Sequence, residues 1–175
     1  MISVVGVGEL MVSSDRQETL ITYALGSCLG VAVYDPVMHV GGLLHVMLPL
    51  SKADPEKAKR RPGMYIDSGF ELLLNQMVDA GARSGNFIIS VAGGASMRPE
   101  GGDDYFKIGK RNFITFRKLM WKNNFMISHQ DVGGSRSRTM SVRIADGLVE
   151  VNKKPIAEPV ASPDGSRLYG SSLFG

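Results

Sequence analysis

Two apolar segments separated by a short turn constrain the fold of this chain more than any other feature. They read CLGVAVY and HVGGLLHVML, and the residues between them are Asp-Pro-Val-Met, 35–38. Asp-Pro favours a turn because proline presets φ at the second turn position. Each segment has the length and the β-branched content of a strand. The sequence therefore predicts a β-hairpin over residues 28–48.

The position of the turn predicts which residues pair across this hairpin. With the turn centred between Pro36 and Val37, Cys28 faces His45 and Gly30 faces Leu43. Directly opposed residues share one sheet face, with Cβ atoms ~5 Å apart. A one-residue slip would place the two side chains on different faces, so the pairing depends on the turn centre. The predicted register places a thiol beside an imidazole.

Cys28 is the only cysteine of the chain, and a neighbouring histidine is what a nucleophilic cysteine requires. A free thiol has a pKa of ~8.5 and is mostly protonated at neutral pH. An adjacent imidazole can take its proton, and backbone N–H groups around Gly26, Ser27 and Cys28 could hold the oxyanion formed at an attacked carbonyl. The alternative interpretation is that Cys28 is a small buried apolar residue, which is the commoner fate of a lone cysteine.

Composition excludes several classes of protein. A single cysteine leaves no internal disulfide and no cysteine-cluster metal site. We expect no membrane insertion, because no apolar run approaches ~18 residues, and no secretory signal peptide. The net charge is +3, and the basic run KAKRRPG has no interleaved aromatic residues, so we expect a solvated segment and no nucleic-acid partner. A reducing, cytoplasmic setting fits this composition.

Hydrophobic periodicity predicts the remaining elements and an α/β (α+β) fold, a single-domain layered sandwich of mixed β-sheets with helices. We expect strands at 2–12, 19–25, 86–94 and 125–134, helices at 65–82 and 107–124, a loop with a helical turn at 51–63, and a second hairpin over 138–154 around Asp146-Gly147. Strand, helix, strand over 86–134 predicts a βαβ crossover with parallel strands. Residues 1–154 would form the domain and the Pro/Ser/Gly-rich residues 155–175 an extended tail.

Five sequence motifs follow one another along the chain: TYALGSC, GGLLHVMLP, VAGGASM, FKIGKRN and DVGG. They resemble those of the CheD family, the chemoreceptor glutamine deamidases of bacterial and archaeal chemotaxis. The resemblance covers residues from about 5 to about 152, and the tail lies outside it. One departure follows DVGG, where the family tends to have Gly before Arg and this chain has Ser137 before Arg138.

The resemblance implies a layered α/β fold and a catalytic triad. By position, Cys28 is the nucleophile, His45 the base and Thr22 the third member. The residues alone indicate Cys28 and His45, whereas Thr22 comes only from the resemblance. The implied reaction converts selected glutamines of methyl-accepting chemoreceptors to glutamate and releases ammonia, without a cofactor or metal. Some members of the family also bind and stimulate a CheC-type phosphatase.

Two other functions compete with this one. The chain could be a non-enzymatic docking module that binds a receptor or a CheC-type phosphatase, or a different thiol hydrolase such as a peptidase. A peptidase creates new chain termini, whereas a deamidase leaves the substrate chain intact and changes glutamine to glutamate.

Overall fold

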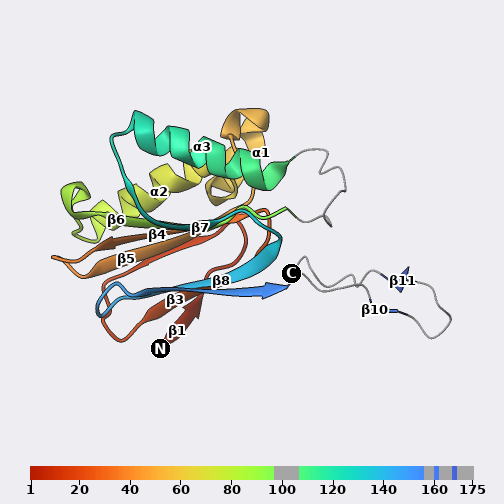
Figure 1. Cartoon of the computed structure of the whole chain (residues 1–175). Helices are drawn as coiled ribbons and strands as arrows, with labels where there is room; N and C mark the ends of the chain where they lie inside the picture. Colours follow the sequence, from red (N-terminus) through yellow and green to blue (C-terminus); the bar gives the residue numbers. More distant parts are fainter. Residues whose placement is uncertain (97–106, 156–159, 162–166, 169–175) are drawn as a thin grey trace.

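The structure is a computed structural model that describes residues 1–96, 107–155, 160–161 and 167–168. Its main body has three layers. Helices α2 (Ile66–Asp79) and α3 (Ile108–Lys122) cover one face of a five-stranded sheet. A four-stranded sheet packs against the opposite face (Figure 1). The predicted α+β layered fold is confirmed.

The five-stranded sheet has the strand order β2-β5-β4-β6-β7 and is mixed. Its strands are β2 (Leu10–Ser13), β4 (Leu29–Asp35), β5 (Val40–Val46), β6 (Ile88–Gly93) and β7 (Ile127–Val132). β6 and β7 pair in parallel, and α3 connects them, so the predicted βαβ unit is confirmed. The other neighbouring strands are antiparallel.

The four-stranded sheet has the order β1-β3-β8-β9. Its strands are β1 (Ile2–Val4), β3 (Thr19–Leu25), β8 (Arg136–Arg143) and β9 (Val149–Pro155). β8 and β9 form the second predicted hairpin, and Gly147 in its turn has a φ of 74°, which glycine adopts at no steric cost. Ser137 pairs with Lys154 within this hairpin, so the departure from the family pattern is accommodated in a regular ladder.

The prediction of one strand over 2–12 is wrong, because β1 and β2 belong to different sheets. The chain changes sheets at Gly8, whose φ is 75°. A Cβ on Gly8 would lie 2.3 Å from Met64 Sδ, so only glycine fits this crossing. The first thirteen residues therefore join the two sheets.

The hairpin over 28–48 is confirmed, but its predicted register is wrong by two residues. Gly30, not Cys28, pairs with His45. The loop is longer than the sequence suggests, since Asp35 Oδ1 accepts hydrogen bonds from the amides of Val37 and Met38 and so extends the turn by side-chain capping. A shift of two residues keeps the same sheet face, because the side-chain period of a strand is two.

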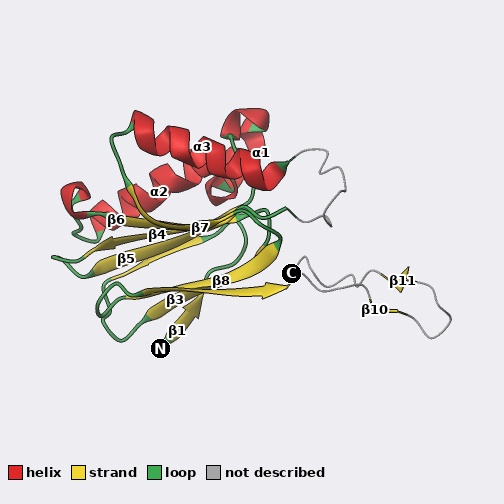
Figure 2. Ribbon diagram, in the orientation of Figure 1, coloured by secondary structure: helices red, strands yellow, loops and turns green. Residues whose placement is uncertain are grey.

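Figure 2 shows the helices and the two sheets as separate layers. Apolar side chains pack between the helices and the five-stranded sheet and between the two sheets. One cluster lies between the helices and the five-stranded sheet and includes Phe70, Leu73 and Met77 of α2, as the predicted helix at 65–82 requires. The other lies between the two sheets and includes Leu20, Leu25 and Met140. The candidate site lies beside this second apolar cluster, between the two sheets.

The segment 51–63, expected as a loop with a helical turn, contains helix α1 (Pro55–Arg60) between 3₁₀ turns at Ser51–Ala53 and Pro62–Met64. Asp54 caps α1 by accepting a hydrogen bond from the Lys57 amide. A third 3₁₀ turn spans Ser84–Asn86.

The predicted tail, 155–175, lies largely outside the described residues. Within it the structure describes two short antiparallel strands, β10 (Val160–Ala161) and β11 (Arg167–Leu168). Across the described ranges, no helix combines the length and apolarity needed to span a membrane.

Candidate active site

A hydrogen bond between the two sheets joins Thr22 of β3 to His45 of β5. Thr22 Oγ1 lies 2.7 Å from His45 Nδ1 and 2.7 Å from the carbonyl oxygen of Val5. The hydroxyl has one proton, and Val5 O can only accept, so Thr22 donates to Val5 and accepts from Nδ1–H of His45. His45 is thereby held in the tautomer whose Nε2 has a free lone pair.

Burial keeps this imidazole neutral. Thr22 is fully buried and His45 is 1% exposed. Loss of hydration lowers the pKa of His45 from 6.5 to about 4. The backbone of His45 is also fixed on both sides, since its N–H donates to Glu9 O and its carbonyl accepts from the Gly8 amide. At neutral pH the residue is a rigid, uncharged proton acceptor.

Cys28 lies in the bend between β3 and β4 and packs against the apolar cluster between the sheets. Cys28 precedes the first residue of β4, and Gly30 is the residue directly opposite His45, so the thiol and the imidazole are not a directly opposed pair. The thiol is half-buried, and desolvation raises its pKa to about 11. The structure thus places both residues of the sequence-predicted pair between the two sheets, but not face to face.

Three successive carbonyls of the bend, at Gly26, Ser27 and Cys28, are held by other elements. Gly26 O accepts from the Ala95 amide at 2.8 Å, and Cys28 O accepts from the Gly94 amide at 2.9 Å. Ser27 O accepts from the side-chain amide of Asn112, in α3, at 2.9 Å. We call residues 26–28 the nucleophile loop. All of its carbonyls are turned into the protein.

The amides of the same loop are placed differently. The Gly26 N–H donates to Ala24 O, where Ala24 adopts a left-handed φ of 57° and interrupts the β3–β8 register. The Ser27 and Cys28 amides donate to no other residue in the described part of the chain. The Cys28 amide faces its own sulfur, a contact that lowers the pKa of the thiol but less than burial raises it. Gly26 therefore completes the turn, and the two following amides hold no other residue.

The glycines Gly30 and Gly41 leave no free space between the two sheets. A Cβ on Gly30 would lie 2.8 Å from Leu25 and 2.9 Å from Met140, and one on Gly41 would lie 2.6 Å from Ile144. The glycines instead allow the second sheet to approach closely.

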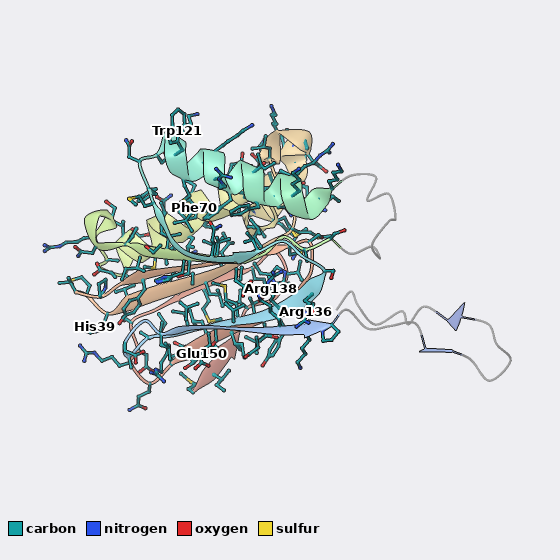
Figure 3. All side chains as sticks on the ribbon, in the orientation of Figure 1. His39, Phe70, Trp121, Arg136, Arg138 and Glu150 are labelled. Atoms are coloured by element: carbon teal, nitrogen blue, oxygen red, sulfur yellow. The ribbon has the colours of Figure 1, made fainter. Side chains whose placement is uncertain are left out.

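Sequence reasoning missed two polar side chains that contact the loop and its neighbours. Asn112 is fully buried, and Arg138 of β8 is 4% exposed. Arg138, which is labelled in Figure 3, pairs with Asp131 and donates to the carbonyls of Gly93 and Gly133. Asn112 carried a signal, because it lies on the apolar face of the predicted helix, in step with Phe116 and Met120. The sequence carries no comparable signal for Arg138, because the burial of this side chain depends on the packing of the two sheets.

Among residues 1–96 and 107–155, no group of three or more His, Cys, Asp or Glu side chains could hold a metal ion.

Comparisons with known proteins agree with this architecture. A family model described as CheD chemotactic sensory transduction matches residues 47–153. The chain is 44% identical over 148 residues to "Probable chemoreceptor glutamine deamidase CheD 1" of Syntrophus aciditrophicus, covering 85% of this chain and 91% of the relative. It is 41% identical over 144 residues to the like-named CheD of Solibacter usitatus, covering 82% and 84%.

An archaeal relative from Pyrococcus abyssi, also named a probable chemoreceptor glutamine deamidase, is 35% identical over 149 residues, which cover 85% of this chain and 90% of the relative. The family model matches residues 47–153, which begin after His45. The chain belongs to the CheD family.

Proposed function

We propose that this chain is a protein-glutamine deamidase that acts on methyl-accepting chemoreceptors and converts selected glutamines to glutamate. The names of its relatives support the reaction and the substrate class. The observation that carries the proposal is the Thr22–His45 hydrogen bond, which leaves His45 Nε2 as a buried proton acceptor in the layer that holds Cys28. A thiol and an imidazole fixed in this tautomer are the parts required for acyl transfer.

In the first step, His45 Nε2 takes the proton of Cys28 as the sulfur attacks the side-chain carbonyl carbon of the glutamine. Burial raises the pKa of the Cys28 thiol to about 11 and lowers the pKa of the His45 imidazole to about 4. These values disfavour a thiolate–imidazolium pair before substrate binds. They favour transfer of the proton during the attack. Both groups rest in their neutral forms at pH 7. Thr22 holds the ring orientation through Nδ1–H, the role that a carboxylate has in other triads.

The tetrahedral oxyanion is held by the amides of Ser27 and Cys28. No other described residue accepts a hydrogen bond from these two N–H groups. Donors that already point to the developing charge stabilise the transition state without reorganisation. Gly26 supports this arrangement as the turn residue that precedes them, because its own N–H donates to Ala24 O.

Collapse of the intermediate breaks the C–N bond, and the proton on His45 moves to the departing nitrogen, so ammonia leaves. A thioester remains on Cys28. His45 then takes a proton from water, which attacks the thioester carbon, and the thiolate regains that proton as glutamate leaves. No cofactor enters this sequence of steps.

The product adds a negative charge to the receptor surface, which changes electrostatic contacts between its helices. We place the reaction in the cytoplasm, because a thiol used as a nucleophile persists in a reducing compartment. A CheC-type phosphatase is a second partner, carried over from the family resemblance. Such docking is the alternative function if the chain proves to have no deamidase activity.

The experiment is incubation of the full chain with the cytoplasmic fragment of a chemoreceptor from the same organism, followed by mass spectrometry of receptor peptides and assay of ammonia. We expect glutamine to become glutamate with the wild type and not with Cys28→Ala or His45→Ala. New receptor termini would identify a peptidase. Receptor binding without conversion would identify a docking module and contradict the proposed activity.

A further inference from the structure

Two buried side-chain polar atoms have no hydrogen-bond partner in the described part of the chain, and both belong to residues at the candidate site. They are His45 Nε2 and Asn112 Oδ1. Folded proteins pair nearly all buried polar groups, so each exception requires an explanation. The proposed base role accounts for His45. The oxygen of Asn112 has no part in that reaction.

The side-chain amide of Asn112 links the two segments that carry the reacting residues. Its Nδ2 donates to Ser27 O at 2.9 Å and to Met47 O at 3.0 Å. Ser27 precedes Cys28, and Met47 follows β5 two residues after His45. Both partners are carbonyls and can only accept, so the amide cannot be rotated to pair its oxygen without losing both bonds.

Packing alone does not account for an asparagine at this position. Leucine has nearly the same shape and would fill the space beneath α3 without leaving a buried oxygen unpaired. Asparagine leaves the buried Oδ1 unpaired, which is unfavourable, but its Nδ2 supplies two hydrogen bonds. Their common effect is to fix the nucleophile loop relative to the end of β5.

We propose that Asn112 is a positioning residue for the deamidation, which orients the Ser27–Cys28 peptide so that its N–H faces the reacting carbonyl. In a trans peptide the C=O and N–H bonds point in opposite directions. With Ser27 O drawn to α3, the Cys28 N–H points away from α3 and donates to no other described residue. This inference rests on the proposed function, because it assigns a donor to the oxyanion of that reaction.

Among the described residues, the hydrogen bond from Asn112 is the one contact to the three loop carbonyls that a side-chain substitution can remove. The neighbouring carbonyls, at Gly26 and Cys28, are held by the backbone amides of Ala95 and Gly94, which no side-chain change deletes. Asn112 alone contributes a side chain, and it holds the central carbonyl of the three.

The test compares Asn112→Asp with Asn123→Asp in the full chain, using ammonia release from the receptor fragment. Asn123 lies at the end of the same helix, where its amide is exposed and donates to Leu119 O, so it controls for the same change in charge. For Asn112→Asp we expect kcat to fall roughly 10- to 100-fold with little change in KM, since small misplacements of catalytic groups have effects of this size. Asn123→Asp keeps wild-type kcat.

Alkylation of Cys28 by iodoacetamide separates positioning from general damage, because this reaction uses the thiol and needs no oxyanion donor. We expect the alkylation rate of Asn112→Asp to stay within about two-fold of the wild type, as the thiol itself is not moved out of its layer. Should Asn112→Asp fail to fold, Asn112→Leu removes both donors and the unpaired oxygen together, and it is expected to fold with the same loss of kcat.

A stable Asn112 variant with wild-type kcat overturns the inference. So does a parallel loss of kcat and alkylation, which would indicate a structural role only. The wild-type and Cys28→Ala arms test the proposed function separately: an inactive wild type refutes that function, whereas an active wild type with unaffected Asn112 variants refutes only the positioning role.

Discussion

Thr22 Oγ1 accepts the Nδ1–H of His45 at 2.7 Å while donating to Val5 O, and this pair of bonds fixes the imidazole tautomer. Thr22→Val keeps the shape of the side chain and removes the hydroxyl. We expect kcat for ammonia release to fall roughly 100-fold, because the ring loses its orienting partner. Two buried groups also lose their partner, which lowers the free energy of unfolding by ~1–3 kcal/mol.

Thr22→Ser is the matched control, since serine retains the hydroxyl, and it should keep most of the activity. The measurements are kcat and a denaturant titration of each variant. Equal activity of the valine and serine variants would contradict the role of the hydroxyl.

Stability should fall in acid because His45 is buried in its neutral form. Its pKa is about 4 in the folded chain and 6.5 when unfolded. Between these values the unfolded chain binds the extra proton, so the free energy of unfolding falls as pH drops from 6.5 to 4, by about 3 kcal/mol in total. Below pH 4 both states bind the proton, and the loss stops growing.

His45→Gln removes this titration and leaves the other histidines in place. Denaturant titrations at several pH values should therefore give a shallower acid slope for the variant than for the wild type. Parallel slopes would show that His45 is not the group responsible.

The Cys28 thiol should react slowly at neutral pH, because burial raises its pKa to about 11. The rate of alkylation by iodoacetamide should rise with pH well beyond 8.5, the pKa of an ordinary thiol. The rate is measured by mass spectrometry of the intact chain, and no other thiol interferes because Cys28 is the only cysteine. A rate that is already constant below pH 7 would instead indicate a stored thiolate–imidazolium pair.

Gly93 should tolerate no side chain, because a Cβ there would lie 2.1 Å from the carbonyl oxygen of Cys28. Its φ is 113°, which is itself unfavourable for alanine. Gly133 also has a positive φ, of 83°, but a Cβ there meets nothing within 4 Å. Gly93→Ala should therefore lower the free energy of unfolding by about 2 kcal/mol more than Gly133→Ala, since only the first combines strain with a clash. Similar losses in thermal denaturation would contradict this close approach.

Arg138 should contribute to stability far more than its exposed neighbour Arg136. Arg138→Met removes the hydrogen bonds to Gly93 O and Gly133 O. It also removes the buried guanidinium that pairs with Asp131. We expect a loss of ~1–3 kcal/mol, because the part-buried Gly133 O loses its donor, whereas Asp131 keeps its ion pair with Lys153. Arg136→Met, two residues away and exposed in Figure 3, should change stability by less than ~0.5 kcal/mol.

The sequence predicts the elements of this fold well where local patterns decide them. The helix at 65–82, the parallel β6–β7 unit and the Asp146-Gly147 hairpin depend on periodicity and turn residues, which are local. The single strand predicted over 2–12 fails because membership of a sheet is decided by distant partners. At Gly8, where the chain changes sheets, the neighbour is Met64, which is far away in the sequence.

The site was predictable in part for the same reason. Cys28 and His45 lie on one hairpin, so their shared face follows from the sequence, although the capping by Asp35 shifts their pairing. Thr22 comes from the other sheet and was indicated only by resemblance. Asn112 contacts Ser27 across 85 residues of chain, a distance that no local pattern spans.

The partners of the nucleophile loop have a consequence during synthesis of the chain. Cys28, His45 and Thr22 leave the ribosome early, but the groups that hold the loop, at Gly94, Ala95 and Asn112, follow much later. A nascent chain that has only its first half contains all three residues of the proposed triad and none of these supports. Deamidase activity would therefore begin only once α3 has docked, so an incomplete chain would not modify glutamines of other proteins.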